Sequence, residues 1–302
     1  MATKDLFFAI LVVIVWGANF TFIRLGLDGV PSMLLVAARY LVVIPAVFFV
    51  KRPKISLKLA LAYGLCVGVI QFSCLFYAMQ IGMPAGLSSI VLQSAAFMTP
   101  IMAMILLGES MKRVQFIGLF IAAGGLYFIA KSSMTGSITS IPLFALFLTL
   151  LAAFFWALSN IIIKVASNQA SEKGEKLDML GVVVWTSLIP PIPALIFAFI
   201  LDSPDTIYSA LTNLSPISIF SIAYLGIGST LFGYGMWSSL LSKYPASKIA
   251  PLSLMVPITG LITARIVLDE RLSSLQWTGG MIIIIGLAFS TLAGQLFNRK
   301  KV

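Results

Sequence analysis

The chain has 302 residues, of which 60% are hydrophobic and 10% charged, with a formal net charge of +10 and no histidine. So few polar residues cannot cover a soluble globule, and the composition therefore predicts an all-α integral membrane protein in the lipid bilayer. The basic residues lie in short clusters between apolar runs, which indicates membrane topology and no binding of nucleic acid. Cys66 and Cys74 share one apolar run, so we expect no disulfide framework, no metal site and no cofactor.

Ten apolar segments are long enough to cross a bilayer, for which a helix needs about 20 residues. In chain order they are 6–26, 32–50, 57–80, 85–107, 113–130, 141–164, 179–201, 216–240, 247–268 and 274–297. The longest polar connection, 167–178, is too short for a soluble domain. We therefore expect the function to lie within the membrane bundle.

The basic residues also predict an orientation. A cytoplasmic N-terminus places 15 of the 20 Lys and Arg residues on the cytoplasmic side. The positive-inside rule favours this arrangement. Because the number of predicted spans is even, both termini are expected in the cytoplasm.

A repeat appears when segment 84–128 is aligned without gaps on segment 245–289. In this alignment 13 of 45 positions are identical, including Pro84 with Pro245, and Glu109 with Glu270. Shared hydrophobicity does not explain matching Pro and Glu residues. We predict two five-helix repeats, 1–133 and 140–302, which have inverted topology because five is an odd number of spans.

Polar residues within the apolar runs form the candidate site. Trp16 lies three residues before Asn19, and Trp156 lies four residues before Asn160 in the first span of the second repeat. One interpretation is that the amides only join neighbouring helices and the indoles fill space. The other is that each repeat contributes one Trp–Asn pair to a substrate site.

Further polar side chains lie deep in other spans. Gln71 and Gln93 each lie near the middle of an apolar run. Arg39 has no acid in its own span, so it binds helix-end carbonyls or lines an aqueous cavity, and the sequence leaves both interpretations open. Arg265 has Asp269 four residues later, which predicts a local ion pair.

Two later spans contain residues that disturb a regular helix. The first carries Tyr234 between glycines, and the second carries Ser253 between two prolines. Glycine permits close helix approach, and proline leaves carbonyl groups free. Both features are compatible with a purely structural role or with a place in the site.

The acidic residues narrow the possible functions. All ten lie at span ends or in loops, so the usual buried proton relay is absent, and a zwitterionic or polar neutral solute fits better than a cation. Amides bind a carboxylate, and aromatic faces receive an ammonium group. Without histidine, an intramembrane serine protease is excluded, so we expect a transporter and not an enzyme. Composition does not separate a carrier from a channel, although an inverted repeat favours a carrier.

Several motifs resemble a known family over essentially the whole chain. They are Trp16-Gly17-x-Asn19, Arg39, Gly82-Met-Pro-Ala-Gly-Leu87, Val91-Leu-Gln93, Gly233-Tyr-Gly235, Ala250-Pro-Leu-Ser-Leu254 and Leu268-Asp-Glu-Arg-Leu272. Together with the twin five-span halves, they are similar to the drug/metabolite transporter superfamily of the EamA type. Within it, the resemblance is to bacterial exporters of O-acetylserine and cysteine.

The resemblance implies export of small amino acids across a bacterial inner membrane, most specifically cysteine and O-acetylserine, by alternating access in a monomer. Other amino acids, neutral metabolites and a facilitative, channel-like permease are the alternatives. The resemblance places the substrate in a central cavity. The residues expected to bind it are Trp16, Asn19, Gln71, Gln93, Trp156, Asn160, Tyr234 and Ser253.

Overall fold

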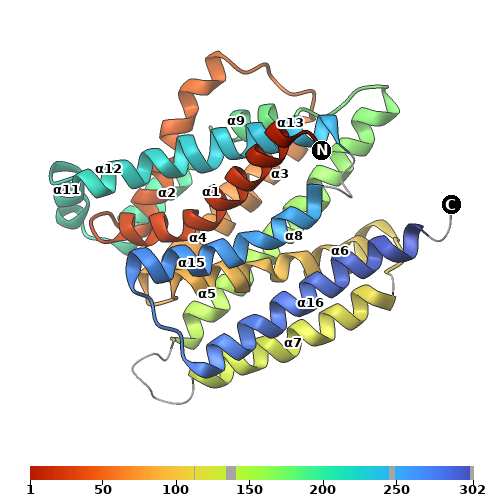
Figure 1. Cartoon of the computed structure of the whole chain (residues 1–302). Helices are drawn as coiled ribbons and strands as arrows, with labels where there is room; N and C mark the ends of the chain where they lie inside the picture. The colour runs from red at the N-terminus through yellow and green to blue at the C-terminus, as the bar shows by residue number, and fades with distance from the viewer. Residues whose placement is uncertain (112, 134–140, 245–248, 300–302) are drawn as a thin grey trace.

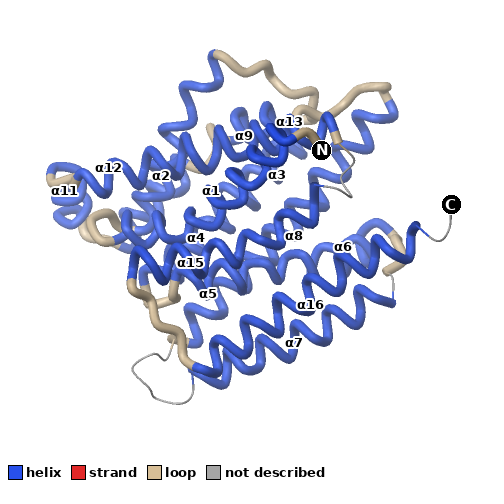
Figure 2. The backbone as a smooth tube through the Cα atoms, viewed as in Figure 1, coloured by secondary structure: helices blue, strands red, loops and turns tan. Residues whose placement is uncertain are grey.

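The computed structural model describes the chain except residues 112, 134–140, 245–248 and 300–302. The described residues form helices joined by turns and loops, with no β-strand among them (Figure 2). This agrees with the predicted all-α class. Figure 1 shows that α1 begins and α16 ends toward the same end of the bundle, and that α11 lies at the opposite end.

In the first half, proline and serine residues mark several helix starts. The Ser56 hydroxyl accepts a hydrogen bond from the Leu59 amide, which caps α3. The helices are α1 (Thr3–Leu27), α2 (Ser32–Val43), η1 (Ile44–Phe48), α3 (Leu57–Tyr63), η2 (Gly64–Gln71), α4 (Phe72–Gln80), α5 (Ala85–Val91), η3 (Leu92–Ser94), α6 (Ala95–Leu107) and α7 (Arg113–Ser133). Of these, η1 and η3 are 3₁₀-helices and η2 is a π-helix, so several apolar runs contain more than one kind of helix.

In the second half, serine and proline residues again mark helix starts. Ser203 and Ser215 each precede a proline and accept a hydrogen bond from an amide in the first turn. The helices are α8 (Leu143–Glu172), α9 (Met179–Thr186), α10 (Pro191–Leu201), α11 (Pro204–Thr212), α12 (Pro216–Ala223), η4 (Tyr224–Phe232), α13 (Gly233–Lys243), η5 (Ala250–Met255), α15 (Val256–Leu268) and α16 (Ser274–Arg299). Here η4 is a π-helix and η5 a 3₁₀-helix.

Irregular features recur in the two halves at the offset that aligns Pro84 with Pro245. At this offset the π-helix η2 matches the π-helix η4, and both the first and the last residue of α6 match those of α15. Both α6 and α15 stop at a residue in the left-handed region, Gly108 with φ 68° and Asp269 with φ 48°. The repeated sequence therefore has repeated local structure, including its departures from the α-helix.

Length and composition identify six described helical segments that are long and apolar enough to cross a membrane. The pair α9 and α10 makes a seventh if it is one span, bent by 44° at the break before Pro191. Shorter apolar helices cover Ser32–Phe48, Leu252–Leu268 and Ser274–Ser290. The chain is thus a multi-pass membrane protein.

Glycine sets the closest helix contacts. A Cβ atom on Gly125 of α7 would lie 2.5 Å from the Gly279 carbonyl oxygen of α16, and the reverse contact is the same. These two helices lie side by side at one edge of the bundle (Figure 1). In the interior, a Cβ on Gly17 of α1 would lie 2.8 Å from the Gly260 nitrogen of α15. Close backbone contact therefore joins the N-terminal helix to the second half.

Candidate substrate site

Trp16 of α1 packs against the second half of the chain. Its indole Nε1 donates a hydrogen bond to the Ser229 carbonyl oxygen at 3.0 Å, within the π-helix η4. Its ring centroid lies 5.4 Å from that of Tyr234 and 5.1 Å from that of Trp237. Gly233 makes room for the indole, since a Cβ there would lie 2.4 Å from Nε1. The sequence feature Gly233-Tyr-Gly235 thus fixes the position of Trp16.

Asn19 lies one turn further along α1 and meets the buried Arg39 of α2. Arg39 Nη1 donates to Asn19 Oδ1 at 3.5 Å, longer than a typical N–H···O hydrogen bond, and Nη2 donates to Thr230 Oγ1 at 3.0 Å. The guanidinium carbon lies 4.1 Å from the centre of the Phe72 ring. Asn19 is 7% exposed and Arg39 2%. Helices from both halves therefore surround one buried cation.

A small cavity adjoins this cation between α2, η2, α9 and η4. About 20 Å³ of it is open to the centre of a water molecule, enough for a water-sized group. The residues with polar side chains that line it are Arg39, Tyr40, Tyr63, Thr186, Thr230 and Tyr234. The hydroxyls of Thr186 and Thr230 donate to backbone carbonyls of their own helices. We define Arg39, Asn19, Thr230, Tyr234 and Trp16 as the Arg39 cluster. It combines a positive charge, hydroxyls and aromatic faces, a set suited to binding.

Three of the eight predicted site residues, Trp16, Asn19 and Tyr234, therefore lie in the Arg39 cluster. Gln71 is buried on η2, the π-helix that also lines the cavity, and its Oε1 has no hydrogen-bond partner in the structure. Gln93 lies half-buried on the 3₁₀-helix η3, and Ser253 half-buried on η5.

The second Trp–Asn pair has different surroundings. Asn160 of α8 is exposed and donates through Nδ2 to Thr99 Oγ1 of α6 at 3.2 Å. Trp156 is half-buried and packs against the main hydrophobic core. No hydrogen bond or ring contact of the described residues joins this pair to the Arg39 cluster. The proposed union of both pairs in one site stays a prediction.

At the end of the bundle where α5 begins, Glu270 joins the two halves. Its Oε2 accepts from the Ala85 amide at 2.7 Å, and Oε1 accepts from the Gly86 amide at 3.0 Å. Burial raises the pKa of the Glu270 carboxyl above its usual range, and the amide hydrogen bonds from the start of α5 act in the opposite direction. A carboxylate at a helix start also complements the positive end of the helix dipole.

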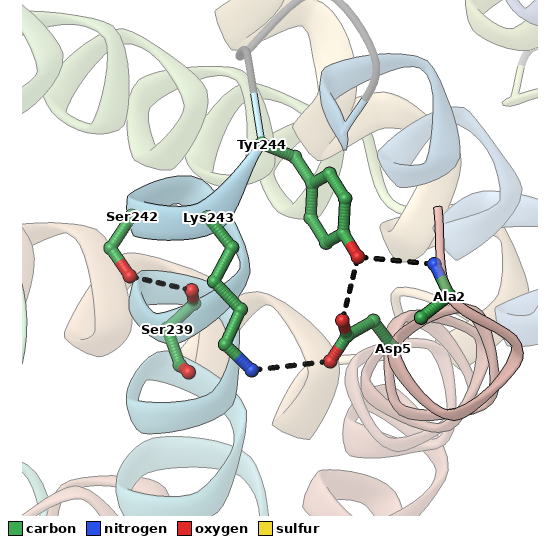
Figure 3. A network of polar contacts seen from close by, with 6 residues as sticks. All are labelled: Ala2, Asp5, Ser239, Ser242, Lys243 and Tyr244. Carbon is green, nitrogen blue, oxygen red and sulfur yellow. Dashed lines mark hydrogen bonds and ion pairs between the residues drawn. The ribbon is translucent and has the colours of Figure 1, made fainter.

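The end of the bundle opposite to Glu270 has its own ion pairs and hydrogen bonds. Glu109, which corresponds to Glu270 in the repeat, pairs through Oε2 with Lys164 Nζ at 2.6 Å. Figure 3 shows a second group, in which Asp5 accepts from Tyr244 at 2.7 Å and from Lys243 at 3.2 Å. The Tyr244 hydroxyl also accepts from the Ala2 amide at 3.1 Å. These contacts fix the start of α1 to the end of α13.

The sequence predicted some of the contacts described above and missed others. The predicted Arg265–Asp269 ion pair is confirmed, with Nη1 to Oδ1 at 2.7 Å. The sequence left the surroundings of Arg39 open and did not single out Tyr63 or Thr230. A signal existed for Tyr63, a phenol several residues inside an apolar run, but nothing in the sequence pairs it with Arg39.

Comparisons with known proteins agree with this architecture. The model of the EamA-like transporter family matches residues 3–131 and again 143–292. A protein of Escherichia coli (strain K12), described as a probable amino-acid metabolite efflux pump, is 40% identical over 288 residues, covering 95% of this chain and 94% of its own. A protein of Salmonella typhimurium with the same description is 40% identical over 303 residues, covering 100% and 99%.

The fold also has a solved counterpart. A structure titled only as the crystal structure of a protein superimposes with a TM-score of 0.62, covering 98% of this chain and 99% of its own. The sequence identity is 14%, so the likeness concerns the fold alone.

Proposed function

The chain belongs to the EamA-like transporter family, and on that premise we propose that it exports small amino acids or their metabolites from the cell. One observation carries this proposal: two proteins described as probable amino-acid metabolite efflux pumps are 40% identical to almost the whole chain. The specific substrates we propose are cysteine and O-acetylserine, on the motifs quoted above. Export of other amino acids or neutral metabolites is the second candidate.

We propose ten membrane spans in two inverted repeats, 1–133 and 140–302. The six long apolar helices, the bent pair α9 and α10, and the three shorter apolar helices supply ten segments. The recurrence of π-helices, helix bounds and left-handed stops at the offset of the sequence repeat supports the two repeats. Inverted repeats of this kind form substrate sites near the membrane midplane.

The proposed orientation puts both termini in the cytoplasm and the protein in a bacterial inner membrane. The excess of basic residues on that side supports it. The contact of Glu270 with α5 would then lie at the outer end, where it closes the bundle in this conformation. The protein acts as a monomeric carrier, without catalysis, metal or cofactor.

The proposed site takes contributions from both halves. Trp16, Asn19 and Tyr234 of the Arg39 cluster contact the solute when the site opens, and the buried Gln71 lies on a helix that lines the adjoining cavity. Gln93, Trp156, Asn160 and Ser253 reach the solute as the halves rock about it. Alternating access then shifts the population between conformations that open at opposite ends.

Solute exchange in proteoliposomes tests this function. We expect purified protein loaded with unlabelled cysteine to take up labelled cysteine with saturable kinetics, and O-acetylserine to compete. Liposomes without protein are the control. Flux that rises without saturation would identify a facilitative, channel-like permease, and no uptake of any amino acid in a panel would refute the proposal.

A further inference from the structure

The guanidinium of Arg39 is a buried charge without an acidic partner. All ten acidic residues of the chain lie in the described parts, and none of them contacts Arg39. Its contacts are with neutral groups, the Asn19 oxygen, the Thr230 hydroxyl and the Phe72 ring. Its Nε has no hydrogen-bond partner in the structure.

The burial of the Arg39 guanidinium has a high desolvation free energy. Removing an ion from water costs several kcal/mol unless a counter-charge and hydrogen bonds compensate for it. Neutral contacts orient the guanidinium but leave its charge uncompensated. An anionic group that enters from outside the protein would supply what the fold lacks.

The cavity beside Arg39 has the size and chemistry for such a group. It accommodates a water-sized group, and three tyrosines, Tyr40, Tyr63 and Tyr234, are among the residues that line it. Guanidinium binds planar carboxylates with two parallel hydrogen bonds, and hydroxyls donate to the remaining lone pairs. The space is too small for a whole amino acid, so the rest of the solute must extend toward side chains that move when the site opens.

We propose that Arg39 binds the carboxylate of the transported solute and thereby restricts the substrates to small carboxylates. The inference rests on the proposed export function and sharpens it. A solute that carries an amine but no carboxylate would leave the buried charge of Arg39 uncompensated. Such amines are therefore excluded, as are neutral metabolites.

Two analogues of cysteine separate the two ends of the solute. 3-Mercaptopropionate keeps the carboxylate and lacks the amine, whereas cysteamine keeps the amine and lacks the carboxylate. In proteoliposomes that take up labelled cysteine, we expect 3-mercaptopropionate to compete and cysteamine to fail at tenfold higher concentration. The same pattern is expected for thermal stabilisation of the detergent-purified protein by each compound.

Substitution of Arg39 provides the second test of this proposal. We expect R39Q to lower the apparent affinity for cysteine at least about tenfold, because charge-assisted hydrogen bonds are lost, and to abolish competition by 3-mercaptopropionate. R39K keeps the charge without the planar fork and should recover part of the affinity. R265Q is the matched control, since Arg265 is exposed and pairs with Asp269, and it should behave as wild type.

A ligand-free measurement separates binding from folding. R39Q removes an uncompensated buried charge together with two hydrogen bonds to neutral groups, so the ligand-free variant should still unfold in one cooperative transition, as R265Q does. If R39Q transports cysteine as wild type does, or if cysteamine competes as well as 3-mercaptopropionate, the role of Arg39 is overturned while amino-acid export stands. If the wild-type protein moves no amino acid, the proposed function fails, and this assignment fails with it.

Discussion

The two Trp–Asn pairs occupy corresponding helices, but only the first is enclosed. Trp16 contacts two aromatic rings and a π-helix carbonyl, and Asn19 accepts from a buried arginine. Asn160 is exposed, and its described hydrogen bond is to Thr99. Two similar Trp–Asn motifs therefore have different surroundings.

The difference between the pairs is informative about conformation. If the two repeats exchange roles during transport, the pair that is enclosed in one conformation is open in the other. Glu270 and Glu109 differ in the same way, since the first binds the start of α5 and the second pairs with Lys164. Substitutions at paired positions test this asymmetry.

The largest effect is expected for Trp16→Ala. The substitution removes two ring contacts and a hydrogen bond to Ser229, so it should destabilise the protein by about 3 kcal/mol and abolish most transport. Trp156→Ala is the matched control, because Trp156 makes no ring contact or indole hydrogen bond among the described residues. Thermal unfolding and flux per inserted protein measure both. Equal losses for the two variants would show that the pairs are equivalent.

A smaller effect is expected for Asn19→Ala. Arg39 loses one acceptor, but this hydrogen bond is long, so its contribution lies at or below the lower end of the about 1.5–3 kcal/mol of hydrogen bonds to charged groups. Cysteine transport should therefore fall by up to about tenfold at unchanged membrane expression. Asn160→Ala should lower flux only a few-fold and leave cysteine binding to the detergent-purified protein unchanged. Wild-type flux in Asn19→Ala would remove Asn19 from the site.

The smallest effect is expected for Lys164→Gln. Both side chains of its pair with Glu109 are 43% exposed, and exposed ion pairs contribute less than about 1 kcal/mol. Glu270→Gln, at the opposite end, removes a carboxylate bound to two amides and should cost more. Chemical denaturation of the two variants compares them. A greater loss for Lys164→Gln would show that the end with Glu109 is the more tightly held.

The sequence predicted the helices and local contacts, but not the contacts between helices that are distant in the chain. Hydrophobic run length located the helices, and a spacing of four identified Arg265–Asp269. The surroundings of Arg39 involve α1, α4 and η4, which are distant in sequence and meet only in the folded bundle. The π-helices escaped prediction because they leave the hydrophobic pattern almost unchanged while altering which carbonyls are free.

The contact of Glu270 with α5 also makes the opening of this end measurable by amide hydrogen exchange. The amides of Ala85 and Gly86 are bound by a side chain of the other half rather than by a carbonyl of their own helix. Their hydrogens exchange with solvent only when that carboxylate withdraws. Their exchange rates therefore report how often the two halves part at this end, in a protein that carries no added probe.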